Sequence, residues 1–281
     1  MKHTKVLTSK RHPIEIALIC TASFIVFLEI APFLWVVLMS FKSRLDIFEL
    51  PPKLLFTPIL DNYYNAFVAG PFSKLLINSL IIDSSSTVLA IAIGTLAAYA
   101  FSRFAIFGAK HIFFFILTTR MCPPVVVALP LFIIYSKVNL YDTRIGVILV
   151  HTVFNLALVV WLMRGFFDEI PQEIDQAAML DGHSDWTVFR KFVLPLAFPG
   201  IVVSAMFCLV FSWNEFLFAM ILTQSGSATL PVGVPQLVTS RGTYWGQVAA
   251  VGVVIVLPVL IFALVFHKYL VRGLTFGAVK T

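Results

Sequence analysis

Charged side chains are scarce in this sequence. Asp, Glu, Lys and Arg make up only 12% of its 281 residues, whereas apolar residues make up 59% and the mean hydropathy is +0.95. A soluble domain keeps about a quarter of its residues charged, because water must solvate its surface. The polar side chains here are too few to cover such a surface. The composition therefore predicts that a lipid bilayer surrounds much of the chain.

Cysteine pairs and catalytic motifs are also lacking. Cys20, Cys122 and Cys208 lie singly in apolar runs, which argues against a disulfide framework or a zinc site. The sequence has no Gly-x-x-x-x-Gly-Lys-[Ser/Thr] phosphate loop, so any ATP must be bound by another chain. No nucleophile–base or metal-ligand constellation stands out, which argues against an enzyme. The basic residues form no aromatic-interleaved patch, so we expect no binding to nucleic acid despite the pI of about 9.3.

Long apolar runs are the main feature that the sequence does have. Backbone groups in lipid must be paired internally, so a span is either a helix or part of a closed barrel. Barrel strands alternate apolar and polar residues, whereas these runs are continuously apolar over about 20 residues, enough to cross about 30 Å of hydrocarbon. The sequence predicts an all-α membrane protein with six transmembrane helices. The expected spans are 14–41, 75–101, 111–135, 145–163, 200–222 and 248–270.

The distribution of Lys and Arg predicts the orientation of these spans. With a cytoplasmic N-terminus, twelve Lys and Arg residues lie inside and seven outside, with Arg120 within a span. We therefore expect cytoplasmic tails at 1–13 and 272–281 on either side of a six-span domain at 14–271. The first span is too long for a cleavable signal and no small-residue cleavage site follows it, so we interpret it as a retained anchor.

The connection at 164–199 is expected inside the cell and has the pattern of a helix–turn–helix. Pro171 suits a first helical turn, and Glu173 and Asp175 complement the dipole at that N-terminus. Gly182 is placed to end this helix, since it adopts positive φ without a Cβ penalty. Ser184 or Asp185 suits the N-cap of a second helix. An amphipathic loop lying on the membrane surface is the alternative interpretation.

This connection resembles the EAA loop of ABC importer permeases. That motif is Glu-Ala-Ala, three residues, Gly, nine residues, Ile, one residue and Leu-Pro. The sequence Gln176-Ala-Ala-Met-Leu-Asp-Gly182, followed after nine residues by Phe192-Val-Leu-Pro195, has the same spacing. Two positions depart from the motif: Gln176 replaces Glu and Phe192 replaces Ile. The resemblance implies that this loop docks on an ATPase through Gln176, Ala177, Ala178, Asp181, Gly182, Leu194 and Pro195.

Further segments are similar to the carbohydrate-uptake branch of these permeases, and within it to MalG-type subunits. They are Ile170-Pro171, Asp181-Gly182, Trp213-Asn214-Glu215-Phe216 and the tail from Arg272 to Lys280. The resemblance implies a bacterial inner-membrane importer of a sugar, oligosaccharide or sugar alcohol. The implied partners are two ABC ATPases carrying ATP and Mg²⁺, a second, MalF-like permease chain, and an extracytoplasmic solute-binding protein. It implies no cofactor on this chain.

Ionisable residues within the spans are candidates for a translocation pathway. Such groups cost roughly 2.5–3.5 kcal/mol at bilayer depth, so each needs a partner or a wet cavity. Arg120 precedes Pro123-Pro124, which must break the third span, and broken helices often line pathways. Trp213, Asn214 and Glu215 in the fifth span combine an aromatic plate with polar groups that suit a polyol. We therefore predict that Arg120 and Glu215 face a common polar cavity.

Three other ionisable residues within the spans have structural interpretations. Glu29 and Asp83 are expected to form hydrogen bonds between helices or to lie at the interface. His151 is expected to be a satisfied residue between helices, because no second His or Cys lies at ligand spacing.

Two other function classes stay open on the residues alone. An ion-coupled secondary transporter would use Glu29, Asp83 or Glu215 as a proton carrier, but it usually has internal repeats, and none is evident. A membrane enzyme would turn over a lipid by itself. Dependence of uptake on ATP, as opposed to a proton gradient, separates an ABC permease from the secondary transporter.

Overall fold

Long helices dominate the fold, as the composition predicts. The computed structural model describes residues 13–240 and 242–275, and the side chains of residues 15–240 and 242–266. In this part of the chain, four helices are long and apolar enough to cross a membrane. They are α1 (Pro13–Ser40), α4 (Phe72–Arg103), α7 (Arg144–Glu169) and α14 (Trp245–Thr275). They coincide with the first, second, fourth and sixth predicted spans.

The third predicted span is broken at the proline pair. Helix α5 (Ala109–Met121) and α6 (Pro124–Lys137) meet at an angle of 94°. Cys122 and Pro123 between them are extended, with ψ of 128° and 124°. Proline lacks an amide hydrogen and disfavours a helical residue before it, so the pair ends one helix and starts the next. The expected break is confirmed, but residues 111–135 are not one continuous helix.

The fifth predicted span is also interrupted. Helix α11 (Phe198–Trp213) ends before Asn214, and α12 (Leu217–Leu222) begins three residues later. The expectation of a continuous helix over 200–222 is therefore wrong at 214–216. At its start, α11 is bent by 75° against the helical segment that precedes it. By length and composition the described chain has four membrane spans, or up to six if each bent pair is one span.

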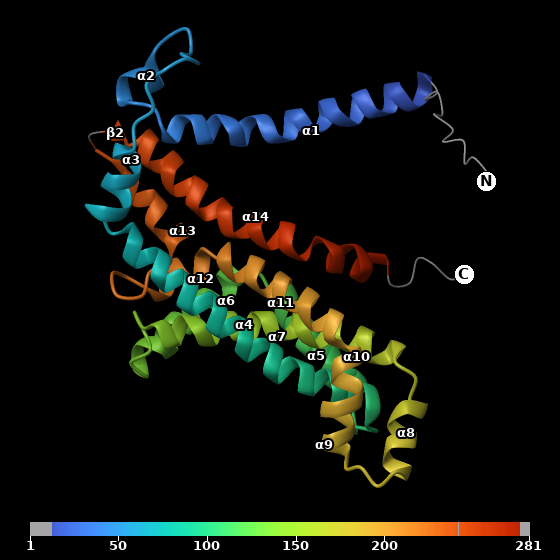
Figure 1. The fold of residues 1–281 in the computed structure, drawn as a ribbon. Helices are drawn as coiled ribbons and strands as arrows, with labels where there is room; N and C mark the ends of the chain where they lie inside the picture. The colour runs from blue at the N-terminus through green and yellow to red at the C-terminus, as the bar shows by residue number, and fades with distance from the viewer. Residues whose placement is uncertain (1–12, 241, 276–281) are drawn as a thin grey trace, which may run out of the picture.

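Helices α4 and α7 pack together along their length and form the centre of the molecule, with α11 and α14 beside them (Figure 1). Gly94 allows the close approach of α4 and α7, since a Cβ there would lie 2.7 Å from Val159 Cγ1. Helix α1 contacts α14 at one end and diverges from it toward the N-terminus. Its apolar window is 0% buried, and Glu29 lies exposed on it. Among the described residues Glu29 has no hydrogen bond to another helix, and its expected alternative, a position at the interface, stays a prediction.

Short elements gather at the end of the molecule opposite α8 and α9 (Figure 1). They are α2 (Arg44–Phe48), α3 (Asp61–Tyr63), the π-helix η1 (Tyr64–Val68), α13 (Leu230–Gly233), the 3₁₀ helix η3 (Val234–Leu237), and the strands β1 (Val238–Thr239) and β2 (Gly242–Thr243). The strands pair antiparallel, Val238 with Thr243. Most of the two predicted tails, residues 1–12 and 276–281, lies outside the described residues.

Candidate functional site

The segment that resembles the EAA loop folds as a helix–turn–helix. Helix α7 continues to Glu169, so the first part of the predicted connection 164–199 is helical. Helix α8 (Glu173–Leu180) is followed by Gly182, whose φ is +86° as expected. Then α9 (Asp185–Val188), the π-helix η2 (Phe189–Val193) and α10 (Leu194–Leu196) form one continuous helical stretch.

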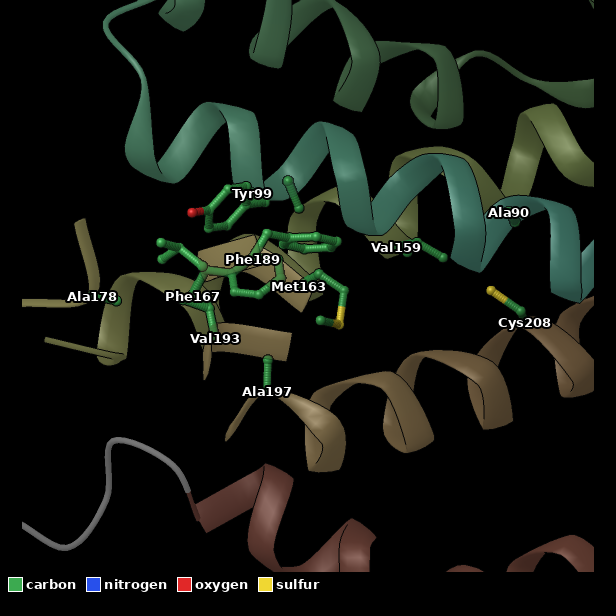
Figure 2. Close-up of a cluster of buried hydrophobic side chains, with 12 residues drawn as sticks. Ala90, Tyr99, Val159, Met163, Phe167, Ala178, Phe189, Val193, Ala197 and Cys208 are labelled. Atoms are coloured by element: carbon green, nitrogen blue, oxygen red, sulfur yellow. The ribbon is translucent and has the colours of Figure 1, made fainter. Parts of the chain in front are cut away.

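One face of this helix–turn–helix joins the core. Ala178, Val188, Phe189 and Val193 are buried with residues of α4 and α7. Figure 2 shows the Tyr99 ring above Phe167 and Phe189, with centroids 5.5 and 4.8 Å away. Apolar packing therefore fixes α8 and η2 against the ends of the long helices.

The other face of the helix–turn–helix is open. Leu180 is 89% exposed and Trp186 is 59% exposed. Of the residues implied by the motif, the exposed ones are Gln176, Ala177, Asp181, Gly182 and Pro195. Ala178 is 4% exposed and Leu194 is half-buried, so these two pack inward. An apolar, exposed surface of this kind is typical of a site where another protein docks.

Arg120 and Glu215 line one cavity, of about 230 Å³, beside the two helix breaks. Arg120 Nη1 donates a 3.0 Å hydrogen bond to the Phe154 carbonyl oxygen. Its guanidinium carbon lies 4.3 Å from the centroid of the Phe211 ring. Among the described side chains no carboxylate pairs with Arg120, so its remaining N–H donors are available to the cavity. Asn155 and Ser212 add polar groups to the wall.

Glu215 fills the break in the fifth predicted span. Its Oε1 accepts a 2.9 Å hydrogen bond from the Phe218 amide, and its Oε2 a 3.0 Å bond from the Ala219 amide. These amides belong to the first turn of α12 and have no partner within their own helix. The carboxylate therefore caps α12, which explains how the chain tolerates a break within this apolar segment.

A buried histidine connects Glu215 to α4. His151 Nε2 lies 3.4 Å from Glu215 Oε2, and its Nδ1 lies 3.3 Å from Asp83 Oδ1. His151 is 3% exposed and Asp83 is 2% exposed. A neutral imidazole has only one N–H, so favourable contacts to both carboxylates require an imidazolium or a protonated carboxyl group. Asp83 and His151 do meet between α4 and α7, but the ring nitrogens of His151 and Oδ1 of Asp83 form no hydrogen bond, so the expected hydrogen bond and the satisfied histidine are not confirmed. The proximity of Glu215 to this pair was not predicted from the sequence.

Trp213 and Asn214 are placed differently from Glu215. Trp213 is 5% exposed and donates a 2.8 Å hydrogen bond from Nε1 to the Ile255 carbonyl oxygen of α14. Asn214 is exposed and its Nδ2 bonds the Val210 carbonyl oxygen of its own helix. Neither residue lines the cavity beside Arg120 and Glu215. A pathway role for these two positions stays a prediction.

Comparison with known proteins identifies the family. Residues 90–276 match the model of the binding-protein-dependent transport system inner membrane component. The chain is 37% identical over 254 residues to the trehalose transport system permease protein SugB of Mycobacterium tuberculosis, covering 89% of this chain and 92% of that one. It is 33% identical over 271 residues to the trehalose/maltose transport system permease protein MalG of Thermococcus litoralis, covering 95% and 97%.

A solved structure shares the fold. A chain of a bacterial ABC transporter that imports the acidic polysaccharide alginate has a TM-score of 0.77 at 22% sequence identity. The match covers 91% of this chain and 96% of that one. The sequence relatives span nearly the full length of the chain, and their family contributes membrane components of transporters, not catalysts. The chain therefore belongs to the binding-protein-dependent transport system inner membrane components, as a multi-pass, MalG-like permease.

Proposed function

We propose that this permease is one subunit of an ATP-driven importer for a sugar, oligosaccharide or sugar alcohol that an extracytoplasmic binding protein delivers. The open face of α8 and α9 carries this proposal. Leu180 and Trp186 there are 89% and 59% exposed, although the opposite face of the same segment is part of the core. Relatives named for trehalose, maltose and diacetylchitobiose support a carbohydrate as the substrate.

The open face is the docking site for an ABC ATPase. In this arrangement ATP and Mg²⁺ bind to two ATPase chains, and the permease contributes Gln176, Ala177 and Asp181 to the contact. Glutamine at position 176 keeps the length of the usual glutamate but not its charge, so hydrogen bonding and apolar contact take the place of an ion pair. The loop lies in the cytoplasm, between the fourth and fifth of six spans, and both chain termini face the same side.

A second permease chain completes the pathway. The apolar window of α1 is 0% buried within this chain, and Glu29 is exposed on it. An ionisable side chain at bilayer depth needs a partner, which a second, MalF-like subunit supplies. The cavity between Arg120 and Glu215 opens on the pathway that the two subunits enclose.

Polar and aromatic groups in this cavity match the chemistry of a polyol. Free N–H donors of Arg120 bind hydroxyl oxygens, while the Phe154 and Phe218 rings, which stack at 4.6 Å, present flat apolar surfaces. Glu215 is occupied by two amides and His151, so it shapes the cavity and holds α12 in place.

Reconstitution tests the proposed function. The permease is purified with its ATPases and partner permease, placed in liposomes, and supplied with the binding protein encoded beside it. We expect uptake of a radiolabelled carbohydrate that requires ATP on the ATPase side and persists when a protonophore collapses any proton gradient. Uptake driven by a proton gradient without ATP would instead establish the ion-coupled alternative.

A further inference from the structure

A buried carboxylate attaches the helix–turn–helix to the end of α4. Asp175, in the first turn of α8, is 5% exposed. Its Oδ1 accepts a 3.0 Å hydrogen bond from the Tyr99 hydroxyl, and its Oδ2 lies 3.2 Å from Arg103 Nε. Tyr99 and Arg103 lie one turn apart on α4, so they reach Asp175 together from one face of that helix.

Arg103 holds two points of the helix–turn–helix. Its Nε pairs with Asp175, and its Nη2 donates a 2.8 Å hydrogen bond to the Ile170 carbonyl oxygen, just before α8. The side chains of Arg103 and Asp175 are both only 7% exposed, so water and salt screen this ion pair little. Arg103 also ends α4 and Asp175 begins α8, which places each charge at the helix end whose dipole favours it.

Helix α4 continues from this attachment to the cavity. It runs without interruption from Phe72 to Arg103 and carries Asp83, which contacts His151 and through it Glu215. Beyond Asp83, Asn78 Nδ2 donates a 2.9 Å hydrogen bond to the Ala228 carbonyl oxygen in the connection before α13. One rigid helix thus has polar attachments at the coupling segment, at the cavity and at the opposite end of the molecule.

We propose that Asp175, bound by Tyr99 and Arg103, is the positioning residue that makes α8 and α4 move as one body. The proposal rests on the proposed function, because it assigns to α8 the movement that an ATPase imposes on it. Apolar contacts hold α8 near the core but allow sliding, whereas a buried ion pair with a hydrogen bond fixes one geometry. With Asp175 in place, displacement of α8 shifts α4 and therefore the Asp83–His151–Glu215 network at the cavity.

The test compares two neighbouring carboxylates in the reconstituted complex. Asp175→Asn keeps the size of the side chain and removes its charge, and Arg103→Gln removes the other partner. Asp168→Asn is the matched control. Asp168 accepts a hydrogen bond from Ser102, the residue next to Arg103, but it lies on α7 and is half-exposed, so it does not hold α8.

Carbohydrate uptake per ATP hydrolysed is the main readout. We expect Asp175→Asn and Arg103→Gln to lower this ratio by at least about fivefold, the lower end of coupling between distant sites, while Asp168→Asn stays within about twofold of wild type. Asp175→Glu should recover part of the loss. A role in folding alone would reduce the amount of complex without changing the ratio. A wild-type ratio in both Asp175→Asn and Arg103→Gln would overturn the proposal.

Two additions keep the test decisive. If Asp175→Asn does not assemble, Tyr99→Phe removes only one hydroxyl, and an unchanged ratio in that variant counts against the proposal. Hydrogen exchange of the purified complex provides a readout that is independent of transport. Asp175→Asn should raise exchange at residues 173–180 with little change in α4, and unchanged exchange there would also overturn it. Failure of the wild type to take up any carbohydrate with ATP concerns the proposed function, not this attachment.

Discussion

His151 of α7 and Glu215 are 64 residues apart in the chain (215 − 151), yet Nε2 of the histidine lies 3.4 Å from Oε2 of the carboxylate. This contact lies at the break between α11 and α12. On the other side of the imidazole, Asp83 Oδ1 lies 3.3 Å from His151 Nδ1. A helix break, a capping carboxylate and a buried histidine are thus parts of one arrangement. Its integrity should determine the shape of the cavity.

Replacing Glu215 by glutamine tests this arrangement. Glutamine has one acceptor oxygen in place of two and no negative charge, so it cannot accept the two α12 amides on separate oxygens and also pair with a positively charged His151. A hydrogen bond to a charged group contributes about 1.5–3 kcal/mol, so we expect uptake to fall on the order of tenfold or more. The complex with the ATPases should still assemble, because the helix–turn–helix is distant. His111→Gln, at an exposed histidine on α5, is the control.

Arg120→Gln in the same assay tests the other side of the cavity. Its guanidinium stacks on Phe211 and bonds the Phe154 carbonyl oxygen, and glutamine reproduces neither contact fully. Normal folding and normal uptake in both Arg120→Gln and Glu215→Gln would show that these charges do not serve a common cavity.

Gly182→Val should disrupt the coupling of ATP hydrolysis to uptake, because valine disfavours the backbone conformation of this turn. The φ of Gly182 is +86°, and a Cβ added there meets nothing within 4 Å, so space is not the obstacle. A left-handed conformation costs an ordinary residue about 1–2 kcal/mol, and β-branching adds to this. We expect normal membrane insertion but a joint loss of substrate-stimulated ATP hydrolysis and uptake. Gly182→Asn, which tolerates positive φ, should keep most activity.

Gly165→Val is the matched control for the glycine at 182. Gly165 also has nothing within 4 Å of an added Cβ, but it lies inside α7 with ordinary helical geometry. The uptake and ATP hydrolysis of the Gly165→Val variant should stay near those of wild type. Full transport by Gly182→Val would contradict the assignment of this turn to ATPase coupling.

The sequence predicted those features that depend on composition and local chemistry. Lipid requires internally paired backbone, so each long apolar run had to be helical. Pro123-Pro124 marked the first break, because proline has no amide hydrogen. Gly182 marked the turn after α8. The break at Asn214 carries neither proline nor glycine, so the sequence did not predict it.

Contacts between helices could not be predicted from the sequence. The spacing between residues 83, 151 and 215 says nothing about how three helices are rotated against one another. The same holds for Asp175, which the sequence assigns to the helix dipole alone, whereas the structure also pairs it with Arg103 and Tyr99. For Trp213 the sequence suggested a role in stacking on a sugar, whereas in the structure its Nε1 donates a hydrogen bond to the Ile255 carbonyl oxygen of another helix.

Reporter cysteines test the orientation in the membrane. In a background without Cys20, Cys122 and Cys208, Ser184→Cys should react with a membrane-impermeant maleimide only from the cytoplasmic side. Ser240→Cys, at the exposed turn after β1, should react only from outside. Ser227 lies in the same outer connection but is 1% exposed, so it is unsuitable as a reporter. The opposite labelling pattern would reverse the orientation deduced from Lys and Arg.

Trp213→Phe should separate packing from transport. The variant loses the hydrogen bond to the Ile255 carbonyl oxygen and part of a buried ring, so we expect a loss of about 1–3 kcal/mol, seen as a lower unfolding temperature. Its apparent affinity for substrate should be unchanged. Trp245→Phe, at a tryptophan that is 46% exposed, should leave the unfolding temperature unaltered. A change in substrate affinity at constant stability in Trp213→Phe would instead place this ring in the pathway.

Asp142 should fix the connection between α12 and α13 in a pH-dependent manner. Its carboxylate accepts hydrogen bonds of 3.0–3.1 Å from the amides of Gln224, Gly226 and Ser227 and from the Ser227 hydroxyl. Burial opposes ionisation, but these bonds outweigh it and hold the pKa of Asp142 below its ordinary value. Stabilisation from a lowered pKa is complete above roughly pH 4, the pKa of an unfolded Asp, and is lost as the pH falls through the folded value.

Hydrogen exchange at residues 224–227 measures this effect directly, since three of these amides are the donors. Protection, corrected for intrinsic exchange rates, should be equal at pH 5 and pH 7. Asp142→Asn should lower it on the order of tenfold at both pH values, because a hydrogen bond to a charged acceptor contributes about 1.5–3 kcal/mol. Asp46→Asn, which removes the Lys53 ion pair elsewhere on this end of the molecule, should not change it. Equal protection in Asp142→Asn and wild type would mean that the neighbouring hydrogen bonds from Asn78 to Gly226 and Ala228 hold this connection instead.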